Sequence, residues 1–168
     1  MIIDKFLSTA LLLAIAASPS AHATPTCDEP FTEVLRVSVS GIFFEQLRVL
    51  DNEAEWCAFW TEAYSNSSSP PPCDATVIDF DTEVAIVAAI GGRSNSCFGV
   101  DIACVGRAGN SENIRVEVVE QQPSLSCVCL PVVVSPLQVV KIARPVHRAN
   151  FKKRIELRDC SGRSVRGR

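Results

Sequence analysis

The chain has 168 residues, of which 47% are hydrophobic, and a formal net charge of −3. Beyond its first residues, no apolar run approaches the roughly 20 residues needed to cross a bilayer, which excludes a helical membrane protein. The charge is uneven: residues 24–140 carry 5 basic and 16 acidic side chains, net −11, whereas residues 141–168 carry 10 basic and 2 acidic, net +8.

Residues 1–23 have the pattern of a secretory signal peptide. Lys5 gives a weak positive start, Phe6–Ala17 is an apolar run of twelve residues, and Ala21-His22-Ala23 is a small-x-small cleavage site. Twelve apolar residues are too few for an anchor that spans about 30 Å of hydrocarbon. We therefore expect an exported protein, periplasmic or extracellular, whose mature chain begins at Thr24.

The first elements of the mature chain follow from local patterns. Residues 24–40 read as an irregular leader and a first strand, because apolar residues alternate from Leu35 to Val39. Phe43–Leu50 predicts a second strand. Asn52 and Glu55 have the spacing of a capping box and predict a helix start. The helix would be amphipathic, with one aromatic face made of Trp56, Phe59, Trp60, Ala63 and Tyr64. We expect this face to pack on a sheet rather than to bind a ligand.

A buried strand follows the proline-rich surface loop Asn66–Pro72. The run from Glu83 to Ile90 is almost wholly apolar, which predicts a strand buried on both faces. Gly91-Gly92 ends it, since glycine accepts positive φ without a steric penalty. The loop Arg93–Cys97 should then lie on the surface beside the most buried strand.

The second half of the chain predicts more strands. Gly99–Val105 and Asn113–Val119 should form a hairpin, and Cys127–Ser135 and Leu137–Ile142 are further strands separated at Pro136. The fold class is therefore α+β: an antiparallel sheet of about five to seven strands with one amphipathic helix packed on it, or alternatively a β-sandwich. Residues 41–146 would be the domain and residues 147–168 a basic C-terminal tail, either solvated or attracted to an anionic surface.

The mature chain holds eight cysteines, and an even number in an exported protein predicts up to four disulfides. They are Cys27, Cys57, Cys73, Cys97, Cys104, Cys127, Cys129 and Cys160. Residues two apart on a strand face the same side, so Cys127 and Cys129 should each form a disulfide with another cysteine and not with each other. We predict that these two pair with Cys97 and Cys104, that Cys57 pairs with Cys73, and that Cys27 pairs with Cys160.

Catalytic and metal-binding signals are weak. His147 is the single histidine after the signal peptide, and it belongs to the basic tail rather than to the predicted core. There is no CxxC pair, phosphate loop or dinucleotide motif. We predict a non-catalytic protein without cofactor or metal; an enzyme that uses His147, or thiol exchange by a cysteine pair, is the less favoured alternative.

The order of several features resembles the C-terminal domain of the PrcB family, named for a non-catalytic subunit of a bacterial surface protease complex. Trp56 in a helix is followed by Asp79-Phe80, an apolar strand, Gly92 and a polar loop. Next come Phe98-x-Val100-x-Ile102, Ile114–Val118, Pro123 and Ser135–Val140. The match covers roughly residues 41–145. It implies a small exported protein that stabilises a partner protease.

The chain departs from the family pattern at three points. Ser96-Cys97-Phe98 stands where the family has Gly-Gly-Tyr, and both the eight cysteines and the basic tail are additional. We predict a protein partner, with a protease as the leading candidate, and no specific nucleic-acid binding. The predicted contact surface is the loop that contains Arg93, Ser94, Asn95 and Phe98. The alternative is a secreted inhibitor that inserts this disulfide-braced loop into a protease cleft.

Overall fold

The structure is a computed structural model that describes residues 26–107 and 111–159. It contains one α-helix, one short 3-10 helix and seven strands. In chain order these are β1 (Thr32–Val37), β2 (Gln46–Leu50), α1 (Glu53–Ala63), η1 (Ala75–Val77), β3 (Glu83–Ala89), β4 (Gly99–Arg107), β5 (Asn113–Pro123), β6 (Leu137–Ala143) and β7 (Arg148–Arg158). The predicted α+β class is confirmed. The predicted signal peptide, residues 1–23, lies outside the described residues.

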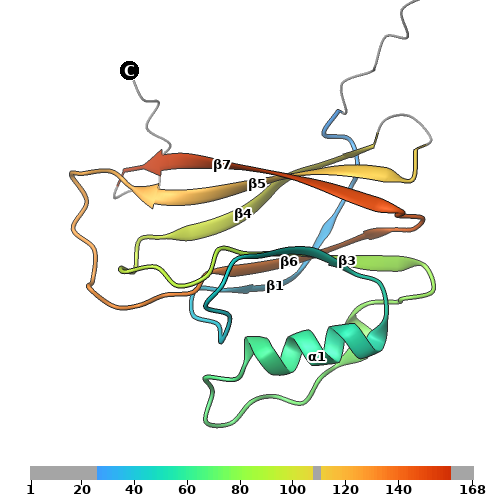
Figure 1. The fold of residues 1–168 in the computed structure, drawn as a ribbon, viewed down its shortest axis with the longest axis horizontal. Coiled ribbons are helices and arrows are strands. Elements are labelled where there is room, and N and C mark those ends of the chain that lie inside the picture. The colour runs from blue at the N-terminus through green and yellow to red at the C-terminus, as the bar shows by residue number, and fades with distance from the viewer. Residues whose placement is uncertain (1–25, 108–110, 160–168) are drawn as a thin grey trace, which may run out of the picture.

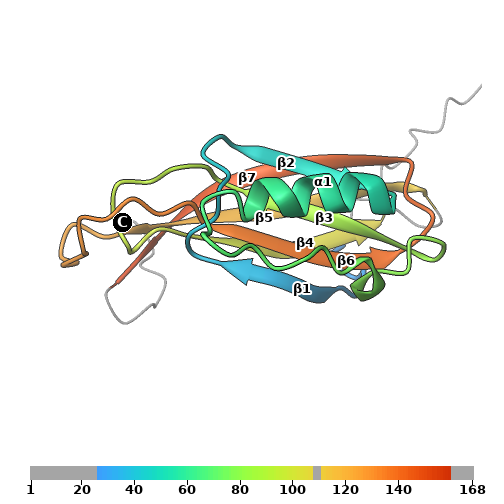
Figure 2. The ribbon, with the colours of Figure 1, turned by 90° about the horizontal axis from the view of Figure 1, so that it is seen from below.

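The elements form three layers (Figures 1 and 2): the helix, a four-stranded sheet and a three-stranded sheet. The strand order is β1-β6-β3-β2 in the first sheet and β4-β5-β7 in the second. All pairs in the first sheet are antiparallel, whereas β5 and β7 are parallel. The seven strands thus divide between two stacked sheets, so the structure combines a helix packed on a sheet with the layering of a β-sandwich.

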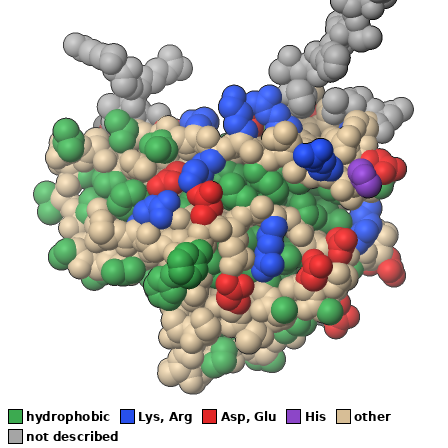
Figure 3. All heavy atoms as spheres, viewed as in Figure 1, with side chains coloured by type: hydrophobic (Ala, Val, Ile, Leu, Met, Phe, Trp, Pro, Cys, Tyr) green, Lys and Arg blue, Asp and Glu red, His purple; other side chains and the backbone are tan. Residues whose placement is uncertain are grey.

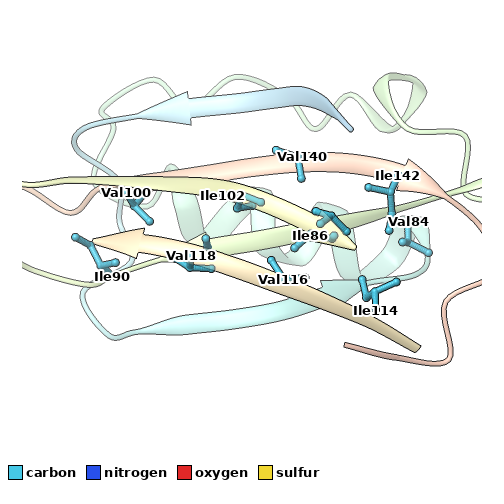
Figure 4. Packing of buried hydrophobic residues seen from close by; sticks show 12 residues of the cluster. Val84, Ile86, Ile90, Val100, Ile102, Ile114, Val116, Val118, Val140 and Ile142 are labelled. Atoms are coloured by element: carbon cyan, nitrogen blue, oxygen red, sulfur yellow. The ribbon is translucent and has the colours of Figure 1, made fainter. Parts of the chain in front are cut away.

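Strand β3 is the centre of the molecule. It pairs with β2 on one side and β6 on the other, and every residue from Val84 to Ile90 is buried. Val84, Ile86 and Ile90 point toward the second sheet, where they meet residues of β4 and β5 such as Ile102 and Val116 (Figure 4). Ala85, Val87 and Ala89 point toward the helix. The double-sided burial predicted from the apolar run is confirmed.

Helix α1 begins as its sequence predicts. The side chain of Asn52 accepts a hydrogen bond of 2.9 Å from the backbone N–H of Glu55, so one of the otherwise unpaired N–H groups of the first turn is satisfied. Trp56 and Phe59 are fully buried against the first sheet. The Cys57–Cys73 disulfide, also predicted, ties the helix to the end of the proline-rich loop.

Two expectations about the strands of the second half differ from the structure, and one is confirmed. Residues 127–133, predicted as part of a strand, form an irregular loop, because Pro131 lacks an N–H and the flanking backbone pairs elsewhere. Residues 148–158, predicted as part of a separate basic tail, form β7 inside the second sheet. The hairpin of β4 and β5 forms as predicted, with a shift in register between Ile102 and Cys104.

Two of the predicted disulfides are wrong. Cys27 bonds to Cys104, which excludes both the Cys27–Cys160 pair and a bond from Cys104 to Cys127 or Cys129. Cys97 bonds to Cys129, one of the predicted partners. The leader crosses beside β4, where the N–H of Glu29 donates to the carbonyl of Val105, so Cys27 reaches Cys104. Sequence spacing carries no information on this crossing.

Candidate protein-binding tip

Two loops lie side by side at one end of the molecule, and we call them together the tip: residues 93–98, after β3, and residues 124–133, after β5 (Figures 1 and 2). Backbone hydrogen bonds of 2.7 and 2.9 Å join Arg93 to Val134 in both directions. The backbone N–H of Ser96 donates to the carbonyl of Leu130 at 3.0 Å, and the N–H of Leu130 donates to the side-chain hydroxyl of Ser96 at 3.1 Å. The Cys97–Cys129 disulfide closes the pair of loops.

The longer loop of the tip exposes apolar side chains that a fold would ordinarily bury. Five of its residues are large, apolar and exposed: Leu125 at 108% of its reference area, Val128 at 96%, Leu130 at 67%, Val133 at 64% and Val132 at 48%. Hydrophobic side chains gather at this left-hand end in Figure 3. Contiguous exposed apolar surface of this kind marks interaction sites on soluble proteins. Because the loop is cross-linked, these side chains are presented on a restrained backbone.

A buried ion pair supports the base of the tip. The guanidinium of Arg93 donates to both carboxylate oxygens of Glu120, at 2.9 and 3.1 Å, and Lys153 approaches the same carboxylate at 3.4 Å. Glu120 is 3% exposed. Burial alone would raise the pKa of the Glu120 carboxyl, but the hydrogen bonds from Arg93 and Gln122 and the charges of Arg93 and Lys153 outweigh it, and the pKa lies below its ordinary value of 4.5.

The predicted contact residues divide between support and surface. Arg93 is committed to Glu120, and the side chain of Asn95 accepts a hydrogen bond from the N–H of Cys97, which shapes the loop. Phe98 is half-buried and lines a small hollow between β1 and β4. Ser94 is exposed. The most exposed apolar groups of the tip therefore belong to the neighbouring loop, which is not among the predicted contact residues.

The sequence contained a signal for that loop. Cys127-Val128-Cys129-Leu130-Pro131-Val132-Val133 is apolar at nearly every position and holds a proline and two cysteines. Such a run reads as a buried strand when only hydrophobicity is considered. A proline inside it, together with cysteines two residues apart that must both bond elsewhere, indicates instead a cross-linked loop.

His147 and one cluster of potential metal-ligating atoms lie apart from the tip. His147 is exposed immediately before β7, with its backbone N–H donating to the carbonyl of Glu112. Cys27, Cys104 and Glu117 bring three potential metal-ligating atoms within 4.8 Å of one another. The first two sulfur atoms are bonded to each other, so they do not supply the thiolates that a zinc site requires.

The three disulfides indicate that the chain folds in an oxidising environment such as that met by exported proteins. Within residues 26–107 and 111–159, no helix has the length and apolar character needed to cross a membrane. No family model, curated protein or solved structure matches this chain.

Proposed function

We propose that this protein is an exported, non-catalytic binding module that docks on a partner protein through the apolar side chains of the tip. The observation that supports the proposal is the exposure of five large apolar residues on one disulfide-braced loop, Leu125–Val133. Apolar anchors on a restrained backbone bind with little loss of conformational entropy, which favours affinity.

The class of partner rests on the resemblance to the PrcB family. That resemblance favours a protease of the bacterial envelope, held in an active state by an accessory subunit. The alternative is an inhibitor whose braced loop enters a protease cleft, and it is favoured by the Cys97–Cys129 cross-link between the two loops. The two functions predict opposite effects on the partner: an accessory subunit prolongs proteolytic activity, and an inhibitor lowers it.

The test compares two exposed apolar sites in one capture experiment. The oxidised mature protein and its Val128→Ser/Leu130→Ser variant serve as baits for an envelope extract, and Val77→Ser, an exposed apolar residue away from the tip, is the matched control. We expect the tip variant to capture about tenfold less of the partner protein than the wild-type bait does. Two apolar side chains that become buried on binding contribute at least about 1.4 kcal/mol to the binding free energy. The control should retain it.

Purified partner then distinguishes the alternatives. If the partner is a protease, its activity against a small substrate and its half-life at constant temperature are measured with and without the bait. Equal capture by the wild-type protein and the tip variant would refute the tip as the contact. A thiol-exchange enzyme would instead react with mild reductant, whereas we expect these disulfides to resist it.

A further inference from the structure

Four strands form the edges of the two sheets, and three of them are protected. Strand β2 has only five residues, and β1 has six with a register shift between Glu33 and Leu35. Strand β4 is covered: the N–H of Glu29 bonds to Val105, and the guanidinium of Arg36 bonds to the carbonyl of Val100. Short length, bulges and cover are the usual means by which native proteins block edge pairing.

Strand β7 has none of these protections. It has eleven residues, and each pairs with β5 in continuous register from Arg148 to Arg158. It contains no proline, and no other strand of the described residues pairs with its outer edge. The carbonyl of Arg158 accepts the N–H of Ser124, which directly follows β5, so the inner edge of β7 is paired to its last residue. The part of the outer edge considered below is Arg148–Ile155, which carries the basic side chains and is longer than an average strand of five or six residues.

The charge of this edge selects among the strands that could join it. Arg148, Lys152 and Arg154 are exposed, and by the register with β5 all three share the outer face of the sheet. Arg154 also pairs with Glu156 at 2.9 Å. Figure 3 shows Lys and Arg side chains over the three-stranded sheet on the side that faces the viewer. Charge is the only protective feature that β7 has, and it repels basic strands while it attracts acidic ones.

A second copy of this chain is a poor occupant. Antiparallel self-pairing centred on Lys153 would place Lys152 opposite Arg154 and Lys153 opposite its own counterpart, and like charges directly opposite destabilise a strand pair. The opposite face of β7 presents Phe151, half-buried, and Ile155, 59% exposed, which an apolar residue on an added strand would cover.

We propose that the outer edge of β7 accepts an extended segment of a partner protein by strand addition, and that this segment alternates acidic residues, over Lys152 and Arg154, with apolar residues over Phe151 and Ile155. Backbone hydrogen bonds to the unpaired edge provide affinity, and the alternating side chains provide selectivity. This surface is separate from the apolar loop of the tip, so each of the two proposals can fail without the other.

The probe is a synthetic peptide of about ten alternating Glu and Val residues, blocked at both ends, near the upper length of an ordinary strand. Its binding to the full oxidised protein is measured by fluorescence anisotropy, and amide hydrogen exchange locates the contact. We expect slowed exchange in Arg148–Ile155 and no binding of the matched Lys–Val peptide. Absence of slowed exchange in β7, or equal binding of the basic peptide, would overturn the proposal.

Two further comparisons separate strand addition from simple attraction of charge. Analogues of the peptide methylated on the backbone nitrogens of either the Glu or the Val residues keep every charge but lose N–H donors. At least one should bind about tenfold more weakly, the equivalent of a hydrogen bond or two. If both bind like the parent, the contact is electrostatic only and strand addition is refuted.

Protein variants complete the test. Lys152→Gln/Arg154→Gln should weaken peptide binding several-fold, whereas Arg48→Gln, a basic residue on β2, should leave it unchanged. Circular dichroism checks that each variant remains folded. Sedimentation equilibrium tests whether two copies of the chain pair with each other. A dimer that the peptide dissociates would show that β7 pairs with itself, and it would overturn the choice of an acidic partner. Binding to anionic lipid vesicles without binding to the peptide would overturn that choice as well.

Discussion

Glu120 is the charged side chain that the described fold buries most completely, and its environment explains how burial is tolerated. An unpaired carboxylate at this depth would be protonated or would destabilise the fold. Here the Arg93 guanidinium binds both carboxylate oxygens, and Lys153 adds a second positive charge. The pair also joins the start of the tip to β5, so the position of the loop depends on the ionised state of one residue.

This arrangement predicts how stability depends on pH. Because the pKa of Glu120 is lower in the folded protein than its ordinary value of 4.5, its ionised form stabilises the fold above pH 4.5, and this stabilisation is lost as the pH falls through the lower folded pKa. Glu120→Gln should cost about 1–3 kcal/mol at neutral pH. Urea unfolding of both proteins from pH 7 to acid measures this, and the difference between them should shrink below pH 4.5. A constant difference would contradict the assignment.

At the scale of the element, α1 shows how one helix uses two similar residues differently. Trp56 is fully buried against the first sheet, whereas Trp60 is half-buried and contacts Tyr64, with ring centroids 4.7 Å apart and ring planes tilted by 45°. Both indole N–H groups donate to carbonyls of the following loop, that of Trp56 to Asp74 and that of Trp60 to Pro71. The two residues thus differ in burial and share a similar polar contact.

Replacement of each tryptophan by alanine therefore isolates the effect of burial. We expect Trp56→Ala to cost about 3–5 kcal/mol, because it leaves a large cavity between helix and sheet. Trp60→Ala should cost about 1–2 kcal/mol, because much of its surface already contacts water. Chemical denaturation followed by far-UV circular dichroism measures both. Equal losses would mean that the loop contacts, rather than the packing on the sheet, hold the helix.

At the scale of the whole molecule, the three disulfides of the described residues differ in what they join. Cys27–Cys104 spans 77 residues and fastens the leader to the second sheet, whereas Cys57–Cys73 spans 16 and closes a local loop. Cys97–Cys129 fastens the tip. The sulfur of Cys127 lies 3.6 Å from the carbonyl oxygen of Arg158, two residues before Cys160, and we expect these two cysteines to form the fourth bond.

Loop length sets the expected order of disulfide contributions. In the chain-entropy description, loss of Cys57–Cys73 costs about 3 kcal/mol and loss of Cys27–Cys104 about 4.5 kcal/mol. Paired Cys→Ala variants unfolded in urea test this order. A larger loss for the short loop would show that strain or local packing, not loop entropy, dominates. Peptide mapping under non-reducing conditions tests the expected bond between Cys127 and Cys160.

What the sequence determined by itself is local. The cap at Asn52, the aromatic face from Trp56 to Ala63 and the doubly buried strand β3 all follow from patterns within about ten residues. Gly91, predicted to turn the chain, has φ of +76°, and the carbonyl of Phe43 lies 2.8 Å from where a Cβ would be. The Cys57–Cys73 pair is also local, since it closes a loop beside the helix.

Only the tertiary structure decided how these elements combine. Periodicity shows that a face must be buried, but not which element covers it, so the division of seven strands into two sheets could not be read from the chain. The parallel pairing of β5 with β7 brings a basic segment into a sheet across an intervening strand. The apolar loop of the tip is exposed because the Cys97–Cys129 bond and hydrogen bonds to Arg93 and Ser96 hold it outside both layers. Those contacts join residues more than thirty positions apart, a separation over which local sequence has no influence.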